Sequence, residues 1–298
     1  MKLLITGAWS YKNQQIEEIK KLGHEIDFLQ YEKDAVENPE RYDGVICNGL
    51  FLHHDIKEFS NLKYIQLTSA GFDRVPMEYT NEKKIAVYNA RGVYSIPMAE
   101  FAISGVLQLY KKSRFFYKNQ ELKKWEKHRD LTELFGKTVC VVGCGNVGTE
   151  CAKRFSAFGC KVLGVDLFPN DNAQFEKIYP LSQKDEILAK SDIVILTLPL
   201  TDETRYMFNK ECFSNFKDGA VLVNIARGGV IDTKALCDAL NNKLFGAVLD
   251  VFEEEPLKEN DSLWDMDNVI LTPHNSFVGE GNADRLFGVI YENLRKWN

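Results

Sequence analysis

Short apolar runs alternate with amphipathic stretches along the whole chain, and this alternation constrains the fold more than any other feature. The runs are rich in β-branched residues, and those of the second part are almost wholly apolar, as strands buried on both faces of a sheet are. Runs of this kind occupy residues 3–5, 25–29, 44–47, 64–67, 85–88, 138–142, 161–166, 192–198, 220–225, 246–251 and 269–271. Strands that alternate with helices need crossover connections, so the pattern predicts an α/β fold with parallel sheets covered on both faces.

Two lobes of this kind are expected, because a chain of 298 residues is long enough for about two domains. Between them, apolar residues at helical spacing predict a helix over residues 97–117 that joins the lobes, with Pro97 in its first turn. The polar segment 118–133 is predicted to be a solvated connection in which Trp125 is the one anchoring aromatic. Other helical patterns, the first with Asp232 as its predicted N-cap, occupy residues 232–241 and 282–297.

The composition excludes several classes of protein. Lys and Arg number 37 against 43 Asp and Glu, which gives a net charge of −6 without any basic block. Such a chain is a poor candidate for binding nucleic acid or an anionic membrane surface. It has no run of about 18 apolar residues and no signal-peptide pattern, so we expect neither a membrane span nor secretion. The seven cysteines form no C-x-x-C pair, which predicts reduced thiols in a cytoplasmic protein rather than disulfides or a metal site.

A glycine motif follows the first strand of the second part. Residues 139–142 run into a G-x-G-x-x-G sequence formed by Gly143, Gly145 and Gly148, and a helical pattern follows. The first glycine permits a tight turn, the second lets the backbone approach a pyrophosphate, and the third lets helix and strand pack closely. The free N–H groups at the start of the helix attract phosphate. The motif therefore predicts a dinucleotide site.

Asp166 ends the next predicted strand, which is where a dinucleotide-binding unit places an acidic residue. Its carboxylate would accept hydrogen bonds from the adenosine ribose and would repel a 2′-phosphate, and no arginine is adjacent to it. These features predict NAD rather than NADP. The alternative is a purely structural glycine turn in which the aspartate caps a loop.

Three later strands are followed by polar residues, at the edge where open α/β sheets bind ligands. Arg227 can hold a carboxylate through two hydrogen bonds, and His274 can move a proton near neutral pH. Glu255, if adjacent to this histidine, would stabilise its protonated form. Taken singly, each residue also has an ordinary structural interpretation: a surface ion pair, an exposed acid and a core histidine.

Together these segments resemble the D-isomer-specific 2-hydroxyacid dehydrogenase family, which includes phosphoglycerate, glyoxylate/hydroxypyruvate and D-lactate dehydrogenases. The resemblance covers nearly the whole chain and is strongest over residues 134–274. The matching motifs are L-F-G-K-T at 134–138, L-P-L-T at 198–201, N-I-A-R-G-G at 224–229, D-V-F-E-E-E-P at 250–256, T-P-H at 272–274 and, in the first lobe, S-A-G-F-D at 69–73.

The resemblance implies an oxidoreductase that acts on CH–OH groups with NAD as acceptor and interconverts a small 2-keto acid and its D-2-hydroxy acid. His274 would donate and accept the proton, with Glu255 sustaining its charge. The implied substrate-binding residues are Ser69, Ala70, Gly71 and Arg227, of which Arg227 also polarises the keto oxygen. The implied cofactor-binding residues are Gly143, Gly145, Asn146, Val147, Gly148, Asp166, Leu198, Pro199, Ile225, Ala226, Asp250 and His274.

Within the cofactor set, Leu198 and Pro199 would line the adenine side, whereas Ile225, Ala226 and Asp250 would orient the nicotinamide.

The family fold is two Rossmann-like lobes with parallel sheets, in which the NAD-binding lobe is inserted into a flavodoxin-like substrate lobe. The implied domains are residues 1–92 with 276–298 for substrate and 93–275 for NAD, with the substrate in the cleft between them. A homodimer through the NAD-binding lobe is also implied, with the apolar face of residues 99–110 as a contributor or else packed within its own lobe. The length of the chain predicts no C-terminal regulatory domain.

The substrate is the least defined part of the resemblance, because residues 93–99 and 275–281 depart from the family pattern. A substrate phosphate needs basic side chains, and the first-lobe loop over residues 48–54 has no Lys or Arg. We therefore expect an unphosphorylated 2-keto acid, with Arg74 and Arg91 as the nearest basic residues that could change this assignment.

Two other functions share the same motifs. A non-catalytic NAD sensor that binds partner proteins, as the family's corepressors do, can keep the three polar residues. The absence of an added tail favours the enzyme. A formate dehydrogenase is disfavoured, because that enzyme has Gln where this chain has Glu255.

Overall fold

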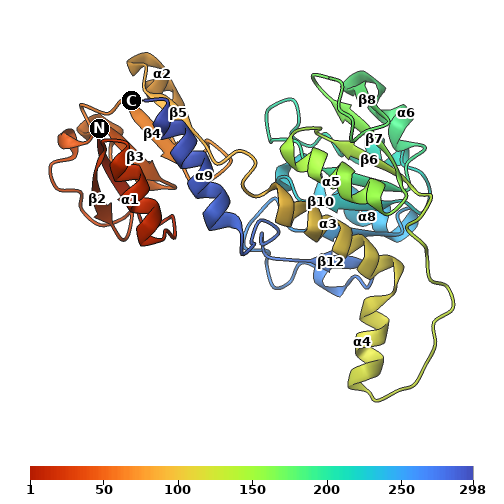
Figure 1. Cartoon of the computed structure of the whole chain (residues 1–298). Helices are drawn as coiled ribbons and strands as arrows, with labels where there is room; N and C mark the ends of the chain where they lie inside the picture. Colours follow the sequence, from red (N-terminus) through yellow and green to blue (C-terminus); the bar gives the residue numbers. More distant parts are fainter. Residues whose placement is uncertain (298) are drawn as a thin grey trace. The chain divides into compact units, whose positions relative to one another are not determined.

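The structure, a computed structural model, describes residues 1–297 and contains two compact units, each with its own sheet (Figure 1). Unit 1 consists of Met1–Tyr94 and Gly279–Asn298, and unit 2 of Ser95–Val278. Unit 1 is therefore made from both ends of the chain. The limits expected from the sequence lie within a few residues of these.

Unit 1 has a parallel sheet in the order β2-β1-β3-β4-β5, which is the flavodoxin-like strand order. Its strands are β1 (Lys2–Thr6), β2 (Glu25–Leu29), β3 (Gly44–Cys47), β4 (Tyr64–Leu67) and β5 (Ala86–Tyr88), and its α-helices are α1 (Asn13–Lys21), α2 (Met77–Lys83) and α9 (Asn282–Arg295). Leu3 and Ile5 pack with residues of α1 and α9, whereas Leu4 packs in the cluster on the opposite face of the sheet. The alternation follows from the two-residue period of a strand.

Unit 2 has a parallel seven-stranded sheet in the order β12-β11-β10-β9-β6-β7-β8. Its strands are β6 (Thr138–Val142), β7 (Lys161–Asp166), β8 (Lys177–Pro180), β9 (Ile193–Leu196), β10 (Val221–Asn224), β11 (Gly246–Leu249) and β12 (Val269–Leu271). One face packs against α3 (Ser95–Tyr110) and α5 (Asn146–Ala157), and the other against α6 (Lys184–Leu188), α7 (Lys210–Ser214) and α8 (Thr233–Asn242). The strand order reverses between β6 and β9, so ligands are expected at the carboxyl ends of these strands.

The predicted α/β class with two parallel sheets is confirmed, and all the predicted strands are present. Asp232 is the N-cap of α8, where its carboxylate accepts a hydrogen bond from the Ala235 N–H at 3.0 Å. β8 was not predicted, because this short edge strand is only half-buried and lacks a continuous apolar run. Within residues 1–297, no helix has both the length and the apolar character needed to cross a membrane.

The helix predicted over residues 97–117 is two helices. α3 ends at Tyr110, and Lys112 adopts a left-handed conformation with φ of 52° before α4 (Ser113–Glu121) begins. The extended segment after α4 does not anchor itself through Trp125, which is 98% exposed. The predicted anchoring role of this tryptophan within its own chain is therefore wrong.

Candidate active site

The glycine-rich loop joins β6 to α5, and its geometry explains each glycine. Gly143 has φ of 99°, and a Cβ there would lie 2.7 Å from the Leu198 nitrogen. A Cβ on Gly148 would lie 2.1 Å from the Gly143 carbonyl oxygen, so only glycine allows α5 to approach the strand so closely. Gly145 is different, because a Cβ there would meet no atom within 4 Å. The loop thus has one glycine for the turn, one for packing and one that leaves the backbone open to a ligand.

The start of α5 offers free hydrogen-bond donors beside this open backbone. Gly145 is its N-cap and no side chain caps the helix, and the first N–H to bond within the turn is that of Thr149, to the Gly145 oxygen at 2.9 Å. The N–H groups of Asn146, Val147 and Gly148 therefore have no partner within the helix. They lie at the positive end of the helix dipole, so the loop fits the pyrophosphate of a dinucleotide.

Asp166 lies at the end of β7, next to the loop, as the sequence predicts. One carboxylate oxygen accepts a hydrogen bond from the Cys144 N–H at 2.6 Å, and the other accepts one from the Phe168 N–H at 2.9 Å. The carboxylate therefore holds the glycine loop as well as lying where a ribose is expected. Since each oxygen has two lone pairs, acceptor positions remain for ribose hydroxyls.

Glu255 and His274, which are separated along the chain, are brought together in unit 2. The imidazole Nδ1 lies 2.8 Å from Oε2 of Glu255, and Oε1 accepts a hydrogen bond from the Phe252 N–H at 3.0 Å. The His274 side chain is 43% exposed and the Glu255 side chain is 37% exposed. A carboxylate on Nδ1 fixes the orientation of the ring and leaves Nε2 available for a proton transfer.

The backbone of His274 is held in an uncommon conformation, with φ of 51°. Its N–H donates to the Asp250 carbonyl oxygen at 2.8 Å. The Asp250 carboxylate is fully buried and accepts hydrogen bonds from the Thr272 hydroxyl and from the backbone N–H groups of Asn275 and Ser276. Asp250 therefore fixes the segment that carries the histidine.

This arrangement bears on the predicted contact between Asp250 and the nicotinamide. Both carboxylate oxygens already accept hydrogen bonds from the protein, and the side chain has no exposed surface. Its direct contact with the cofactor stays a prediction. Its role in holding residues 272–276 was missed, because nothing in a linear sequence pairs an aspartate with backbone groups more than twenty residues away.

Arg227 follows β10 and is half-buried. Its Nη1 donates to the Ala226 carbonyl oxygen at 2.8 Å, and the buried Asn224 side chain bonds both the Ala226 N–H and the Arg227 carbonyl. The next residue, Gly228, lies so close to Phe252 that a Cβ would approach its carbonyl carbon to 1.8 Å. The Arg227 loop is thereby packed against the loop that holds Glu255, so the three polar candidates occupy neighbouring loops of one sheet edge.

The remaining predicted cofactor residues differ in exposure. Pro199 is exposed after β9, whereas the side chains of Leu198, Ile225 and Ala226 are buried in the core of unit 2. Any cofactor contact from these three would therefore come chiefly from the backbone. Their roles stay predictions.

The predicted substrate loop belongs to unit 1, where it follows β4. The Ser69 hydroxyl donates to the Gly71 carbonyl oxygen at 3.0 Å, and the Ala70 carbonyl accepts a hydrogen bond from the Asn89 side chain at 2.5 Å. Neither the Ala70 N–H nor the Gly71 N–H has a hydrogen-bond acceptor within the described residues. The loop therefore presents two adjacent backbone donors, which can bind a carboxylate oxygen.

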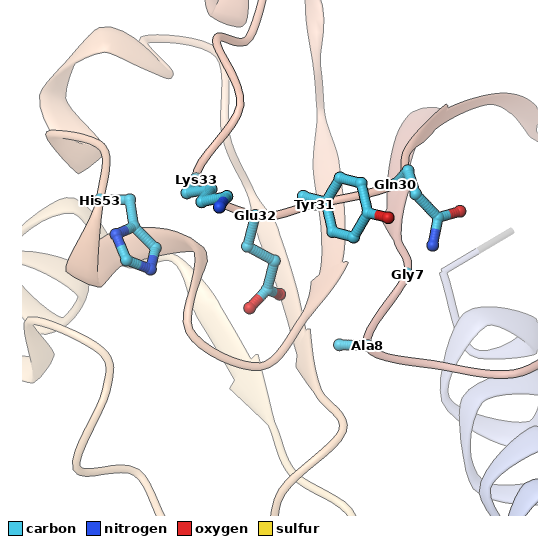
Figure 2. A pocket seen from close by; sticks show the side chains of 7 residues that line it. All are labelled: Gly7, Ala8, Gln30, Tyr31, Glu32, Lys33 and His53. Carbon is cyan, nitrogen blue, oxygen red and sulfur yellow. The ribbon is translucent and has the colours of Figure 1, made fainter.

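One carboxylate of unit 1 was missed by the sequence analysis. Glu32 accepts hydrogen bonds from the Thr6 hydroxyl and from the N–H groups of Asn48 and Gly49, at 2.6–2.8 Å. It also lines a pocket of about 300 Å³ together with His53 (Figure 2). The Glu32 carboxylate, which follows β2, is therefore bound to the backbone of the loop after β3.

Comparison with known proteins identifies the family. Residues 103–276 match the model of the D-isomer specific 2-hydroxyacid dehydrogenase, NAD binding domain, which is more than half of the chain. The chain belongs to the D-isomer-specific 2-hydroxyacid dehydrogenase family. The NAD-binding domain of this 2-hydroxyacid dehydrogenase family member lies within unit 2, and it contains the glycine loop, Arg227, Glu255 and His274.

Several relatives carry names of enzymes. The chain is 36% identical to a hydroxypyruvate reductase of Thermotoga maritima, over 77% of this chain and 74% of that protein. It is 35% identical to a D-3-phosphoglycerate dehydrogenase of Methanocaldococcus jannaschii, over 85% of this chain and 49% of that protein. The chain thus spans about half the length of the phosphoglycerate dehydrogenases that it matches.

Among solved structures, the D-lactate dehydrogenase of Aquifex aeolicus, complexed with NAD and lactic acid, is similar over 99% of this chain and 95% of that chain. The TM-score is 0.78 and the identity is 27%. These relatives are named dehydrogenases and reductases, so the comparisons give no support to a non-catalytic sensor.

Proposed function

We propose that this protein is an NAD-dependent 2-keto acid reductase in which His274 is the acid/base. The observation that carries the proposal is the 2.8 Å contact between Nδ1 of His274 and Glu255, in a chain of the 2-hydroxyacid dehydrogenase family. The bound nicotinamide would supply the hydride. Arg227 would bind the substrate carboxylate and polarise the keto oxygen.

In the proposed reaction, the side chains of this protein carry out the proton transfer. In reduction, Nε2 of protonated His274 would donate its proton to the oxygen that develops negative charge, and Glu255 would stabilise the imidazolium before transfer. In oxidation, neutral His274 would accept the proton from the hydroxyl group. The N–H groups of Ala70 and Gly71 would bind the second carboxylate oxygen of the substrate.

Replacing Glu255 by Gln tests the coupling between the two side chains. The amide keeps one oxygen acceptor, for Nδ1 or for the Phe252 N–H, and removes the negative charge that favours protonated imidazole. In keto acid reduction, we expect kcat/KM at neutral pH to fall about tenfold or more, because the proton donor loses the charged partner that supports it. The measurement is steady-state NADH oxidation with a 2-keto acid.

The neighbouring Glu254→Gln is the matched control, because Glu254 forms a surface ion pair with Lys258 at 2.6 Å and faces no catalytic candidate. Its kcat/KM should equal that of the wild type. Equal kcat/KM for Glu255→Gln and the wild type would contradict the proposed acid/base pair.

For the substrate, we propose a small unphosphorylated 2-keto acid. The Glu32 carboxylate disfavours a phosphate near residues 48 and 49, since like charges repel. Arg74 is a basic residue beside this loop, with its Cδ 3.9 Å from the position of a Cβ on Gly49. The test measures NADH oxidation with glyoxylate, pyruvate, hydroxypyruvate and phosphohydroxypyruvate. Preference for the phosphorylated acid, lost in Arg74→Gln, would overturn this assignment, and no turnover on any substrate would overturn the proposed activity.

For the cofactor, we propose NAD rather than NADP because of the Asp166 carboxylate. Asp166→Asn keeps one of the two oxygen acceptors, for the N–H of Cys144 or of Phe168, and removes the charge that repels a 2′-phosphate. We expect the preference for NADH over NADPH, as a ratio of kcat/KM values, to fall about tenfold or more, which corresponds to at least ~1.4 kcal/mol. A wild-type protein that already prefers NADPH would show this assignment to be wrong.

For assembly, we propose a homodimer through the segment of the NAD-binding domain that includes α4 and the residues after it. The apolar face of α3 is not available for this contact, because Ala99, Ala102 and Val106 are fully buried in the unit's own core. The exposed apolar side chains lie further along: Tyr117, Leu122 and Trp125 are 61%, 53% and 98% exposed. Large exposed aromatic residues of this kind are typical of interfaces.

Trp125→Asp should weaken such a dimer, because it replaces a large apolar contact by a charge. We expect light scattering after size-exclusion chromatography to show the wild type as a dimer and Trp125→Asp as largely monomer. Phe168→Asp, another exposed aromatic on unit 2 at 79% exposure, is the control and should leave the mass unchanged. A monomeric wild type would contradict the proposal.

A further inference from the structure

One thiol of unit 2 has a lysine amine as its neighbour. Nζ of Lys184, the first residue of α6, lies 3.0 Å from Sγ of Cys212 in α7. The lysine side chain is 14% exposed, and Cys212 is 4% exposed. The two groups are thus in contact just below the surface, on the face of the sheet opposite α3 and α5.

This environment distinguishes Cys212 from the other cysteines. Cys144 and Cys160 contact backbone carbonyl oxygens, and the partly exposed Cys237 lies near the Ser262 hydroxyl. Among residues 1–297, Cys212 is the cysteine whose sulfur is hydrogen-bonded to a side-chain nitrogen. The geometry therefore pairs one nucleophilic sulfur with one potentially nucleophilic amine.

The amine is held in place by its surroundings. Nζ of Lys184 also lies 2.7 Å from a carboxylate oxygen of Asp185 and 5.6 Å from the centre of the Phe208 ring. Burial acts against the charged amine, but the Cys212 thiolate and Asp185 act more strongly, so the pKa of Lys184 is raised. Burial raises the pKa of Cys212, and the nearby ammonium group opposes this rise. Since the attacking form of Lys184 is the neutral amine and its pKa is raised, the amine becomes more available for reaction as the pH rises.

We propose that Lys184 and Cys212 form a covalent crosslink when the protein is exposed to hydrogen peroxide. In the first step, peroxide transfers one oxygen atom to sulfur, so that the thiol becomes a sulfenic acid and one water is released. In the second, the neutral Lys184 amine attacks the sulfur. The N–S bond forms, the S–O bond breaks, and the hydroxyl group leaves with the amine proton as a second water. A second peroxide can insert one oxygen between nitrogen and sulfur, with release of another water.

The crosslink would connect α6 to α7. The segment between β9 and α7 includes Leu198 and Pro199, the residues proposed to lie on the adenine side of the cofactor. A covalent bond at Cys212 would therefore fix the far end of this segment. It would also reduce the conformational freedom of the unfolded chain by closing the loop from residue 184 to 212.

The test is peptide mass spectrometry of the whole protein after peroxide treatment, with and without later reduction by dithiothreitol. We expect the peptides of Lys184 and Cys212 to be joined, with the summed mass reduced by two hydrogens, or with one further oxygen if a second peroxide reacts. Reduction should separate them. The crosslinked protein should also unfold at a temperature higher by roughly 5 °C or more.

Three variants make the test specific. Lys184→Arg keeps the positive charge but lacks a primary amine, and Cys212→Ser keeps the size of the side chain; both should give no crosslink and no peroxide-dependent rise in unfolding temperature. Cys237→Ser removes the most exposed thiol and should retain both effects. The proposal is overturned if treated wild-type protein yields separate Lys184 and Cys212 peptides, whether Cys212 is unmodified or oxidised to a sulfinic acid.

Discussion

Replacing His274 should lower the rate of 2-keto acid reduction by about 10²–10⁴-fold, the contribution typical of a positioned acid/base. Nε2 is the atom expected to donate the proton, because Nδ1 is engaged with Glu255 at 2.8 Å. The measurement is kcat for NADH oxidation with the best keto acid of the panel.

The choice of variant matters, because the His274 backbone has φ of 51°. Asn tolerates this left-handed conformation better than most residues other than glycine, so His274→Asn removes the imidazole without adding much backbone strain. His274→Ala serves as the second variant. Both should bind NADH with an affinity near that of the wild type, measured by fluorescence titration. Wild-type kcat/KM in both variants would contradict the proposed role.

Replacing Arg227 should have the second large effect. Loss of a guanidinium group that binds a substrate carboxylate removes charge-assisted hydrogen bonds worth about 3–4 kcal/mol, so kcat/KM should fall about 10²–10³-fold in Arg227→Ala. NADH affinity should change little, because the glycine loop and Asp166 lie on other strands. Steady-state kinetics and NADH titration together check this prediction.

Arg227→Lys is the matched variant for the geometry of the contact. Lysine retains the charge but cannot form two parallel hydrogen bonds with a carboxylate, so it should recover only part of the lost activity. Arg205→Ala is the control, because Arg205 lies near Gly229 in unit 2 but is not among the proposed substrate-binding residues. Equal kcat/KM for Arg227→Ala and the wild type would remove Arg227 from the mechanism.

Much of the fold follows from local patterns in the sequence. The apolar runs predict the strands, since a strand covered on both faces has no polar side to present. The glycine motif predicts the turn between β6 and α5, because Gly143 needs a left-handed conformation and Gly148 has no space for a side chain. Asp232 predicts the start of α8 through its hydrogen bond to a nearby N–H. In each case the relevant contact lies within a few residues or follows from a repeated spacing.

Local sequence patterns predict less of the candidate active site than of the fold. Arg227, Glu255 and His274 were selected from their positions after strands and from the resemblance to a family, since spacing alone does not show which loops are adjacent. The exposed Trp125 was misjudged, because a single aromatic in a polar segment is equally compatible with an anchor and with an exposed contact. The break at Lys112 was missed because no glycine or proline marks it, although the polar residues 111–114 interrupt the apolar spacing.

By itself, the sequence determined the α/β class, the strands, the glycine loop and the residues with the right chemistry, because these depend on local conformation and on periodic burial. The tertiary structure decided which groups meet. It placed Glu255 on Nδ1 of His274, bound the buried Asp250 carboxylate to residues 272–276, set Glu32 against the loop after β3, and brought Lys184 to Cys212. These contacts join residues far apart in the chain, and they depend on strand order and loop packing, which no local pattern specifies.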